Sequence, residues 1–507
     1  MQRANAPANV SPATKSKLLA ATILAAMALT GCGGGGGDDP PSSPATQPPP
    51  TTPPSGNTAP TVSAGADRTI ELPVNALELQ GTATDADTAQ TLTIAWTANP
   101  AAGVTFDNPA SPTSRVTFTS PGTYELTLSA NDGTVATTDA VAITVSPAVY
   151  PSADSETDPN HGWLAASPAD VGMDAAKLLE AQTYALTGGG AGLISRRGRL
   201  VQQWGDIDIR FDIKSTTKSM GSIALGLAID RSLLALTDTA QSRLPGLGSD
   251  PADTSPTPND PTLLTQITIE QLATHTAGFA KPGGSDVDLL YAPGTKWTYS
   301  DGGLNWLADT LTNVFQQDLS SVLTSAVWTP LGITTDDLTW RAVPVSTPRP
   351  PVPNSIAQRE LASGMVANAN AMARIGLLFL RKGVWNDQRI LSEEFIQTAS
   401  TPRPATAAAE LIDPAGFPSA NEGYGLLWWT NAARQLPDVP ADAYWAWGLG
   451  DSLIVVIPSL DLVIARTGNS PDERPHLPKW RNDWNGNYEV LRPFLTPIVQ
   501  AVTPTTP

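Results

Sequence analysis

The chain has 507 residues, with 30 Lys and Arg against 48 Asp and Glu, and a formal net charge of −18. This length accommodates two or three domains. The acidic balance and the lack of a basic patch in the sequence argue against a nucleic-acid partner, and the single cysteine, Cys32, excludes an internal disulfide.

The first 31 residues are typical of a secretion signal. Three basic residues precede an apolar run over residues 18–29, which is shorter than the ~20 residues that a membrane-spanning helix needs. The run ends in Leu-Thr-Gly-Cys at residues 29–32, which resembles a bacterial lipobox. The resemblance implies a lipoprotein signal peptide over residues 1–31, cleavage before Cys32 and a diacylglycerol on its thiol. A free cysteine after an ordinary signal peptide is the alternative.

The residues after the cysteine predict where such a lipoprotein resides. Gly33 follows Cys32 where an aspartate could stand, which in Gram-negative lipoproteins tends to mean the outer membrane. We therefore expect a protein anchored through Cys32 in the outer membrane of a bacterial cell envelope, facing the periplasm or the exterior. Residues 32–57 form a tether, because a run of five glycines is flexible and the prolines that follow are extended.

Residues 58–147 predict a small β-sandwich. Short alternating runs, such as residues 92–96 and 124–128, are separated by turn signals. The string Ser-Pro-Gly-Thr-Tyr-Glu-Leu-Thr-Leu-Ser-Ala-Asn-Asp-Gly at residues 120–133 resembles PKD-type immunoglobulin-like domains. Such a domain serves either as a spacer or as a module that binds glycan or another surface.

Residues 152–507 mix helix and strand signals and form the expected catalytic domain. A hairpin is predicted to turn at Arg197-Gly198, and residues 453–458 pair with residues 462–465. Residues 368–381 predict an amphipathic helix and residues 488–502 a final helix. Early strands, a helical middle and late strands indicate an α/β fold with a helical insert.

A Ser-x-x-Lys tetrad at residues 215–218 begins a predicted buried helix. Three residues apart on a helix, Ser215 and Lys218 share a face, and the helix N-terminus offers free N–H groups and partial positive charge. A nearby amine and oxyanion donors are what a serine nucleophile needs. Taken alone, the tetrad also fits an N-cap serine with a surface lysine.

Several further motifs occur in a fixed order. Tyr299 lies in Thr-Tyr-Ser-Asp-Gly-Gly, before a predicted helix, and residues 267–279 read Ile-Thr-Ile-Glu-Gln-Leu-Ala-Thr-His-Thr-Ala-Gly-Phe. Residues 372–378 (Met-Ala-Arg-Ile-Gly-Leu-Leu) and 423–429 (Gly-Tyr-Gly-Leu-Leu-Trp-Trp) follow. Together with the tetrad, these segments resemble the superfamily of class C β-lactamases, DD-peptidases and esterases, in register over residues 160–500.

The resemblance implies the fold and the roles. The expected fold is of the β-lactamase/transpeptidase-like α/β (α+β) class, with a five-stranded antiparallel sheet flanked by helices beside a helical subdomain. Ser215 attacks an acyl carbon, and Lys218 or Tyr299 takes its proton. The ammonium is expected to lower the pKa of Tyr299. The Ser215 N–H and a second N–H on an edge strand form the oxyanion hole, worth ~3 kcal/mol per donor.

That edge strand departs from the family pattern. The family carries Lys-Thr-Gly or His-x-Gly there, whereas this chain has Trp-Ala-Trp-Gly-Leu-Gly-Asp at residues 445–451. One alignment puts Trp447 and Gly448 on the triplet and another puts Gly450 on its glycine. Either way, the cation that would hold a β-lactam carboxylate is missing. Asp301 also replaces an asparagine, which removes an amide donor. Both changes favour an esterase or small-amide hydrolase.

Other chemistries receive less support. Residues 450–453 spell Gly-Asp-Ser-Leu, but an esterase of that type carries the motif near the start of its domain. The three histidines and the lack of a Gly-x-Ser-x-Gly sequence argue against a Ser-His-Asp triad, and His275 is expected to be structural. No cluster has zinc-ligand spacing, so we expect no metal and no cofactor. The tryptophans at residues 428, 429, 445 and 447 either pack in the core or line an acyl pocket.

The sequence therefore predicts a lipid-anchored envelope serine hydrolase that cleaves a small-molecule ester or amide through an acyl-enzyme on Ser215. A penicillin-binding DD-peptidase or β-lactamase is the second hypothesis. The third is an envelope-binding protein without activity, against which the intact Ser215, Lys218 and Tyr299 argue.

Overall fold

The computed structural model describes residues 56–88, 90–153, 158–249, 259–281, 288–343, 355–418, 420–468 and 487–503. The predicted signal peptide, Cys32 and almost all of the tether lie outside these residues. Among the helices that the structure describes, none has both the length and the hydropathy that crossing a membrane requires.

The first part of the described chain consists of small sheets. Four strands pair in the order β2-β9-β8-β5 and three in the order β3-β7-β6, and β1 pairs with β4. The bounds are β1 (Thr61–Ser63), β2 (Arg68–Glu71), β3 (Ala76–Glu78), β4 (Thr82–Thr84), β5 (Thr93–Asn99), β6 (Val104–Phe106), β7 (Arg115–Phe118), β8 (Gly122–Asn131) and β9 (Ala136–Ser146). The runs predicted around residues 92–96 and 124–128 are strands β5 and β8.

The core of these sheets follows the predicted alternation. From Tyr124 on, every second residue of β8, including Leu126 and Leu128, is buried. Trp96 is also buried and its ring stacks on Phe106, with centroids 6.3 Å apart. The Tyr124 hydroxyl donates a hydrogen bond to the Ser120 carbonyl, 2.9 Å away, which is the tyrosine corner found in immunoglobulin-like sandwiches.

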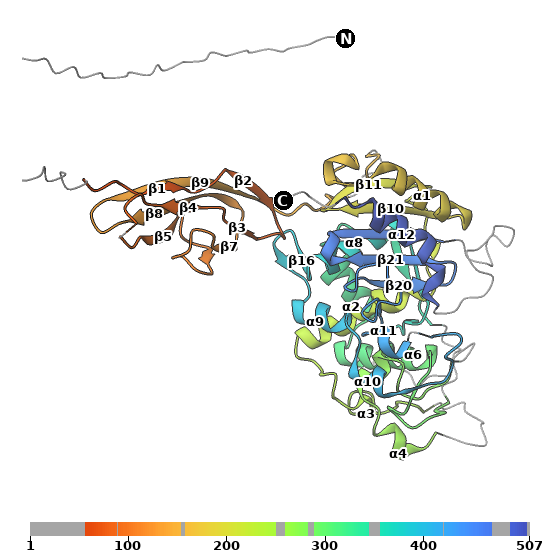
Figure 1. The fold of residues 1–507 in the computed structure, drawn as a ribbon. Helices are drawn as coiled ribbons and strands as arrows, with labels where there is room; N and C mark the ends of the chain where they lie inside the picture. Colours follow the sequence, from red (N-terminus) through yellow and green to blue (C-terminus); the bar gives the residue numbers. More distant parts are fainter. Residues whose placement is uncertain are drawn as a thin grey trace, which may run out of the picture. The chain divides into compact units, whose positions relative to one another are not determined.

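A larger antiparallel sheet organises the second part (Figure 1). Its order in the described residues is β11-β10-β22-β21-β20-β19. The bounds are β10 (Ala191–Arg196), β11 (Arg199–Trp204), β19 (Trp429–Thr430), β20 (Tyr444–Gly448), β21 (Ser452–Ile457) and β22 (Leu462–Thr467). The predicted hairpin and the predicted late strand pair are confirmed. The predicted number of five strands is wrong, because the two-residue strand β19 pairs with β20 and adds a sixth.

Helices cover both faces of this sheet. In β22, Val463 faces Gly376 of helix α8 (Ala369–Leu380), whereas Arg466 bonds the Ala185 carbonyl of helix α1 (Ala175–Thr187). Val463 and Arg466 are three positions apart in one strand, so their side chains point to opposite faces. The last helix, α12 (Arg492–Ala501), packs against α1, and its Phe494 contacts Trp204 of β11. Helix α12 and a short 3₁₀ turn confirm the predicted C-terminal helix.

Helix α8 differs from its prediction. The sequence predicted one polar face, but all of its residues are buried. One side of α8 packs on β10, β21 and β22. The polar side chains of the helix contact other buried parts of the protein instead of solvent. Arg374, for example, donates to the carbonyls of Leu331 and His161. The sequence alone does not distinguish an arginine that donates to buried backbone carbonyls from one that faces solvent. For this reason the prediction of a polar, solvent-facing side of α8 was wrong.

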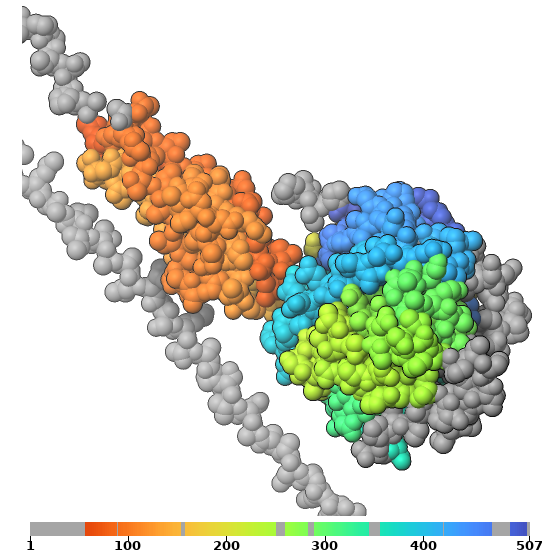
Figure 2. Space-filling view, turned by 90° about the horizontal axis from the view of Figure 1, so that it is seen from below, coloured from red at the N-terminus to blue at the C-terminus, as the bar shows by residue number. Residues whose placement is uncertain are grey.

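The helical insert of the second part lies beside the sheet. It contains α3 (Ala240–Arg243), α4 (Pro261–Leu264), α5 (Ile269–Ala273), α6 (Asp301–Phe315) and α7 (Leu319–Leu323), followed by a π-helical turn at Thr324–Trp328. In the space-filling view these segments contribute to a continuous yellow-green and green surface (Figure 2). Helix α2 (Thr216–Asp230) contacts both α6 and the sheet strand β20, so it connects the insert to the sheet.

Shorter elements complete the second part. They are β12 (Phe211–Asp212), β13 (Lys296–Trp297), β14 (Leu338–Trp340), β15 (Met365–Ala367), β16 (Val384–Trp385), β17 (Gln388–Arg389), β18 (Glu410–Leu411), α9 (Glu393–Ala399), α10 (Pro404–Ala408), α11 (Ala420–Gly423) and the 3₁₀ turns Ala169–Val171, Pro458–Leu460 and Tyr488–Val490.

Two neighbouring leucines of α1 test the packing of this helix. Leu178 is fully buried, whereas Leu179 is 58% exposed. We expect Leu178→Ala to lower the free energy of unfolding by about 2–5 kcal/mol, because it leaves a cavity. Leu179→Ala, the matched control, should cost less than about 0.5 kcal/mol. Urea unfolding followed by tryptophan fluorescence measures both, and equal losses would contradict the packing described for α1.

Candidate active site

The candidate nucleophile stands at the start of helix α2. Ser215 is the N-cap residue, yet its side chain makes no capping hydrogen bond. Its hydroxyl oxygen instead lies 3.0 Å from the Nζ of Lys218. Lys218 is only 2% exposed, so the alternative of a capping serine with a surface lysine does not fit this geometry.

Lys218 is a buried ammonium with an acceptor for each of its protons. Besides the Ser215 hydroxyl, its Nζ lies 2.8 Å from Oδ1 of Asp301 and 2.7 Å from the Ala362 carbonyl. A buried charge is costly unless it is paired and hydrogen-bonded. The three contacts therefore hold Lys218 beside Ser215 and connect α2, the first residue of α6 and the segment at Ala362.

Tyr299 completes the group. It is 4% exposed, and its hydroxyl lies close enough to Ser215 and Lys218 for both to lower its pKa. The Nζ of Lys218 lies 4.7 Å from the centroid of its ring. The ring stacks on Phe417, with centroids 5.1 Å apart and planes 14° apart, and on Trp429 at 6.3 Å. The structure thus brings Ser215, Lys218 and Tyr299 together as the sequence predicted, with Asp301 as a fourth member.

The predicted decrease in the pKa of Tyr299 is wrong. Burial raises the pKa of Tyr299, the Lys218 ammonium lowers it, and the Asp301 carboxylate raises it again, so the pKa lies above its ordinary value. Burial lowers the pKa of Lys218, but Asp301 and Tyr299 outweigh burial and raise it overall. Both groups are therefore protonated near neutral pH, and the group that accepts the Ser215 proton must first lose its own.

His275 positions the tyrosine loop. Its Nδ1 accepts a hydrogen bond from the Ser300 N–H at 3.1 Å, and its carbonyl accepts one from the Thr298 N–H at 3.1 Å. Its Nε2 lies 3.2 Å from the Tyr424 hydroxyl. Burial, with help from the Lys218 charge, holds the pKa of His275 well below its ordinary value. His275 thus holds both residues that flank Tyr299, Ser300 through its neutral imidazole and Thr298 through its backbone carbonyl, in agreement with its predicted structural role.

The strand with the unusual third motif lies against the first turn of α2. A Cβ on Gly448 would stand 2.1 Å from the Ile213 carbonyl oxygen and 2.9 Å from the Thr216 nitrogen, so only glycine fits there. The Thr216 hydroxyl also donates to the Ser452 carbonyl at 2.7 Å. Gly448 is therefore in direct contact with the turn that carries Ser215.

The other two candidates of this motif face different partners. The Gly450 carbonyl accepts a hydrogen bond from Arg466, at 3.1 Å. The indole N–H of Trp447 donates to Asp451 Oδ1 at 3.1 Å, and the side chain is buried. Among the described residues, the Ser215 N–H makes no hydrogen bond and is available to an oxyanion.

The four tryptophans and the serine of the Gly-Asp-Ser-Leu string are buried packing residues. The four tryptophans at residues 428, 429, 445 and 447 are at most 2% exposed, and Trp429 contributes by stacking on Tyr299. They are core residues and do not line an open pocket. Ser452 is fully buried at the start of β21, and its hydroxyl accepts a hydrogen bond from the Gly468 N–H. The Gly-Asp-Ser-Leu string thus spans a turn and the first two residues of a strand and carries no exposed nucleophile.

Sequence reasoning missed one charged residue of the site. The Nζ of Lys281 lies 5.0 Å from the centroid of the Tyr299 ring. Lys281 follows the segment at residues 267–279 that the resemblance singled out, but it belongs to none of the motifs. Its position at Tyr299 depends on the fold between the two loops, which a sequence pattern does not give.

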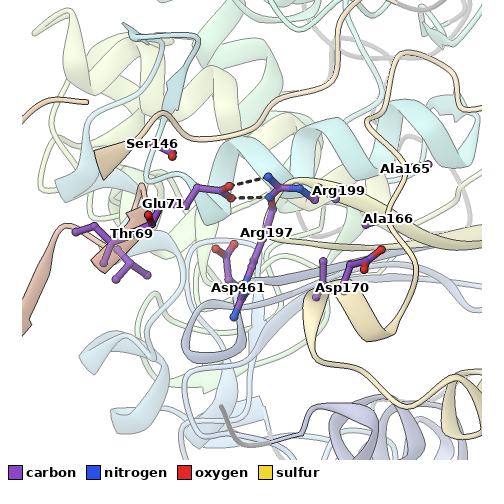
Figure 3. Close-up of a pocket in the computed structure, with 12 residues that line it drawn as sticks. Thr69, Glu71, Ser146, Ala165, Ala166, Asp170, Arg197, Arg199 and Asp461 are labelled. Atoms are coloured by element: carbon purple, nitrogen blue, oxygen red, sulfur yellow. Dashed lines mark hydrogen bonds and ion pairs between the residues drawn. The ribbon is translucent and has the colours of Figure 1, made fainter. Parts of the chain in front are cut away.

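A cavity of about 570 Å³ lies apart from this group (Figure 3). Its lining includes Glu71 of β2 and Arg199 of β11, which form a two-fold ion pair with both N–O distances at 2.6 Å. Ser215, Lys218 and Tyr299 do not line it. Within the described residues, no group of three or more His, Cys, Asp or Glu side chains could hold a metal ion.

A serine, a buried lysine and a tyrosine in contact define a site suited to acyl transfer. Comparison with protein families agrees with this class. The family model described as Beta-lactamase matches residues 175–487, more than half of the chain. The protein therefore belongs to the β-lactamase family and has its β-lactamase/transpeptidase-like fold. A second family model, described as K319L-like, PKD domain, matches residues 64–145, so the strand-rich first part is a PKD-like domain.

Solved structures of related proteins are distant in sequence. A putative β-lactamase from Bacteroides dorei is 15% identical with a TM-score of 0.48, over 65% of this chain and 99% of its own. A putative 6-aminohexanoate-dimer hydrolase from Bacillus anthracis is 15% identical with a TM-score of 0.48, over 69% and 89%. A penicillin-binding protein homolog from Caulobacter crescentus is 16% identical with a TM-score of 0.47, over 63% and 95%. No curated protein matches the chain.

The Asp301 carboxylate predicts a pH dependence. It raises the pKa of both Lys218 and Tyr299, so Asp301→Asn should lower both. The rise of kcat/KM with pH should then move to lower pH whichever group accepts the proton. Asp238→Asn, which removes a carboxylate paired with Arg243 outside the site, is the control. A pH profile of ester hydrolysis measures the effect, and an unmoved profile in Asp301→Asn would contradict it.

Gly448 tests the contact between strand and nucleophile. Gly448→Ala should slow phosphonylation of Ser215 by roughly 10²-fold, because the methyl group displaces the turn that carries it. Gly383→Ala is the control: its Cβ would stand 2.2 Å from the Leu391 carbonyl oxygen, and its φ of +80° makes the substitution at least as strained as the one at Gly448. Gly383 and Leu391 lie near the C-terminal end of α2, where the carboxylate of Asp230 accepts a hydrogen bond from the Ser392 N–H. The rate of labelling per folded molecule is measured for both variants. Equal rates for Gly448→Ala and Gly383→Ala would contradict the contact between Gly448 and the turn that carries Ser215.

Proposed function

We propose that this protein is a lipid-anchored serine hydrolase of the bacterial cell envelope that cleaves esters or small amides through an acyl-enzyme on Ser215. The observation that carries the proposal is the buried contact of Ser215 with Lys218 and Tyr299. A buried lysine that contacts a serine hydroxyl is an arrangement that activates a nucleophile.

The proposed first step starts from the form of the site in which Lys218 or Tyr299 has lost its own proton to solvent. The Ser215 oxygen attacks the carbonyl carbon, and its proton passes to that deprotonated group. The carbonyl oxygen becomes an oxyanion, which the Ser215 N–H and an N–H of the turn after Gly448 stabilise. The tetrahedral intermediate then expels the alcohol or amine, which takes up the transferred proton. Water attacks the acyl-enzyme in the same way, giving the carboxylic acid and free Ser215.

Two features favour esters and small amides over β-lactams. Trp447, which one of the two alignments places where the family carries a cation, is buried and bonded to Asp451, so this position offers no charge to a β-lactam carboxylate. Asp301 is bonded to Lys218 and, as a carboxylate, is not the amide donor that the family uses for an acylamide side chain. A penicillin-binding or β-lactamase activity is the second candidate, favoured by the family match itself.

The proposal also includes the location of the protein, which is the bacterial cell envelope. The lipobox-like sequence supports a lipidated Cys32 after removal of residues 1–31, with residues 32–57 as the tether. The PKD-like domain would then be a spacer between the membrane and the enzyme, with glycan or surface binding as its alternative. Palmitate labelling of wild type and Cys32→Ala tests the anchor.

Covalent labelling distinguishes the candidate activities. The full-length protein is treated with a fluorophosphonate, p-nitrophenyl butyrate and a penicillin, and adducts are read by intact mass. We expect a fluorophosphonate adduct and ester turnover, reduced roughly 10⁴-fold in Ser215→Ala and ~10²-fold or more in Tyr299→Phe, without a stable penicillin adduct. Ser222→Ala, a buried serine on the same helix, is the control and should retain labelling.

The other outcomes are equally clear. A stable penicillin adduct on Ser215 would replace the esterase proposal with a penicillin-binding one. Absence of labelling by every probe would favour a binding protein without catalytic activity.

A further inference from the structure

The turn between β20 and β21, at residues 449–451, presents two N–H groups beside the nucleophile. Leu449 and Gly450 are partly exposed, whereas Asp451 is buried. Among the described residues, the N–H groups of Leu449 and Gly450 make no hydrogen bond. Because the preceding Gly448 packs against the first turn of α2, these two groups are the candidates for the second donor of the oxyanion hole.

The backbone of this turn needs support from elsewhere in the protein. Gly450 and Asp451 both have left-handed backbone angles, with φ of +78° and +59°. An aspartate adopts such an angle only in a minority of cases, so the surroundings must stabilise it. An oxyanion donor is effective only when it is fixed before the reaction begins. The group that fixes this turn therefore determines how well the second donor works.

Arg466 of β22 supplies that support from behind the turn. Its side chain is fully buried. Its Nη1 donates to the carbonyl of Gly450 at 3.1 Å and to that of Asp451 at 2.6 Å. Since a guanidinium is planar and its donors have a fixed geometry, the two bonds restrict both the position and the orientation of these carbonyls.

The same guanidinium is bonded to the end of helix α1. Its Nη2 donates to the carbonyls of Ala185 at 3.2 Å and Gly189 at 3.0 Å. A cation is favoured at this end of a helix, where the carbonyl groups carry partial negative charge. Burial lowers the pKa of Arg466 to about 10, against the opposing effects of Asp451 and Tyr184, so the side chain is charged near neutral pH. Arg466 therefore connects the turn to α1.

We propose that Arg466 is a positioning residue that holds the turn at residues 449–451 against the end of α1 and thereby fixes the second half of the oxyanion hole. This inference rests on the proposed hydrolase function and adds a residue on which the stabilisation of its transition state depends. Arg466 touches neither substrate nor Ser215 in this role. Its effect should be confined to species that carry an oxyanion.

The rate of acyl transfer and the affinity for a transition-state analogue test the role together. Butylboronic acid accepts an electron pair from a serine oxygen, and the tetrahedral boronate carries a negative oxygen like the reaction intermediate. In full-length Arg466→Lys, which keeps the charge but cannot bond both sides, we expect kcat/KM for p-nitrophenyl butyrate and the affinity for butylboronic acid to fall by the same factor, roughly 10²-fold.

Binding of the intact ester provides the readout that a general loss of structure would also change. The affinity of p-nitrophenyl butyrate for Ser215→Ala, measured by calorimetry, should be unchanged when Arg466→Lys is added, because an ester carbonyl makes little use of the oxyanion hole before attack. A fall in this affinity equal to the fall in kcat/KM would overturn the positioning role.

Arg374 offers a matched control. It is also a buried arginine, 1% exposed, and donates to the carbonyls of Leu331 and His161 away from the site. Arg374→Lys should lower the free energy of unfolding, yet leave kcat/KM and boronate affinity per folded molecule unchanged. Equal kinetic losses in Arg466→Lys and Arg374→Lys would disprove the specific role of Arg466.

Hydrogen exchange in the wild-type protein provides a test that does not depend on a variant folding. If the guanidinium couples the turn to α1, a boronate that immobilises the turn must also restrain the end of α1, because coupling between two sites is reciprocal. We expect butylboronic acid to slow amide exchange at Gly188 and Gly189 as well as in the turn, and to leave helix α9 unchanged. Slowing in the turn alone would overturn the proposal.

Turnover by the wild type separates the two proposals. Ester turnover that Arg466→Lys lowers no more than Arg374→Lys would disprove the role of Arg466 and leave the hydrolase proposal standing. Absence of both ester turnover and boronate binding in the wild type would disprove the hydrolase proposal, and the oxyanion role of Arg466 with it.

Discussion

The buried ammonium of Lys218 is the constraint on which the site depends. A charge that is almost completely withdrawn from water must be compensated on every side. The protein does this with a hydroxyl from its own helix, a carboxylate from the start of α6 and a carbonyl at Ala362. These groups come from three separate segments, so correct folding of all three is needed before Ser215 acquires its neighbour. Stability and reactivity therefore rest on the same contacts.

The carboxylate at Asp301 changes the proton balance of this arrangement. By pairing with Lys218 it keeps the ammonium charged, and by its proximity it makes ionisation of Tyr299 harder. The resting site is thus fully protonated and compact. An asparagine at this position would offer a hydrogen bond to a substrate without this effect on the two pKa values. In the proposed hydrolase, Asp301 would consequently affect both the pH at which the site works and the substrates that it favours.

Much of the fold and the centre of the site could be predicted from the sequence. Ser215 and Lys218 were identified because helical spacing places them on one face, and Tyr299 because several motifs occur in order. The electrostatics could not be predicted in this way, since the pKa of Tyr299 depends on burial by Phe417 and Trp429, which come from distant segments. Lys281 was missed for the same reason. Helix α8 was misjudged because its polar residues satisfy buried carbonyls instead of facing water.

Both ring nitrogens of His275 already have hydrogen-bond partners, and this has a chemical consequence. Nδ1 accepts the Ser300 N–H, so in the neutral ring the hydrogen is on Nε2 and points to the Tyr424 hydroxyl. The ring is 2% exposed, with no lone pair directed toward an incoming acyl group. Reagents that inactivate triad proteases by alkylating the imidazole, such as chloromethyl ketones, should therefore find no target in His275.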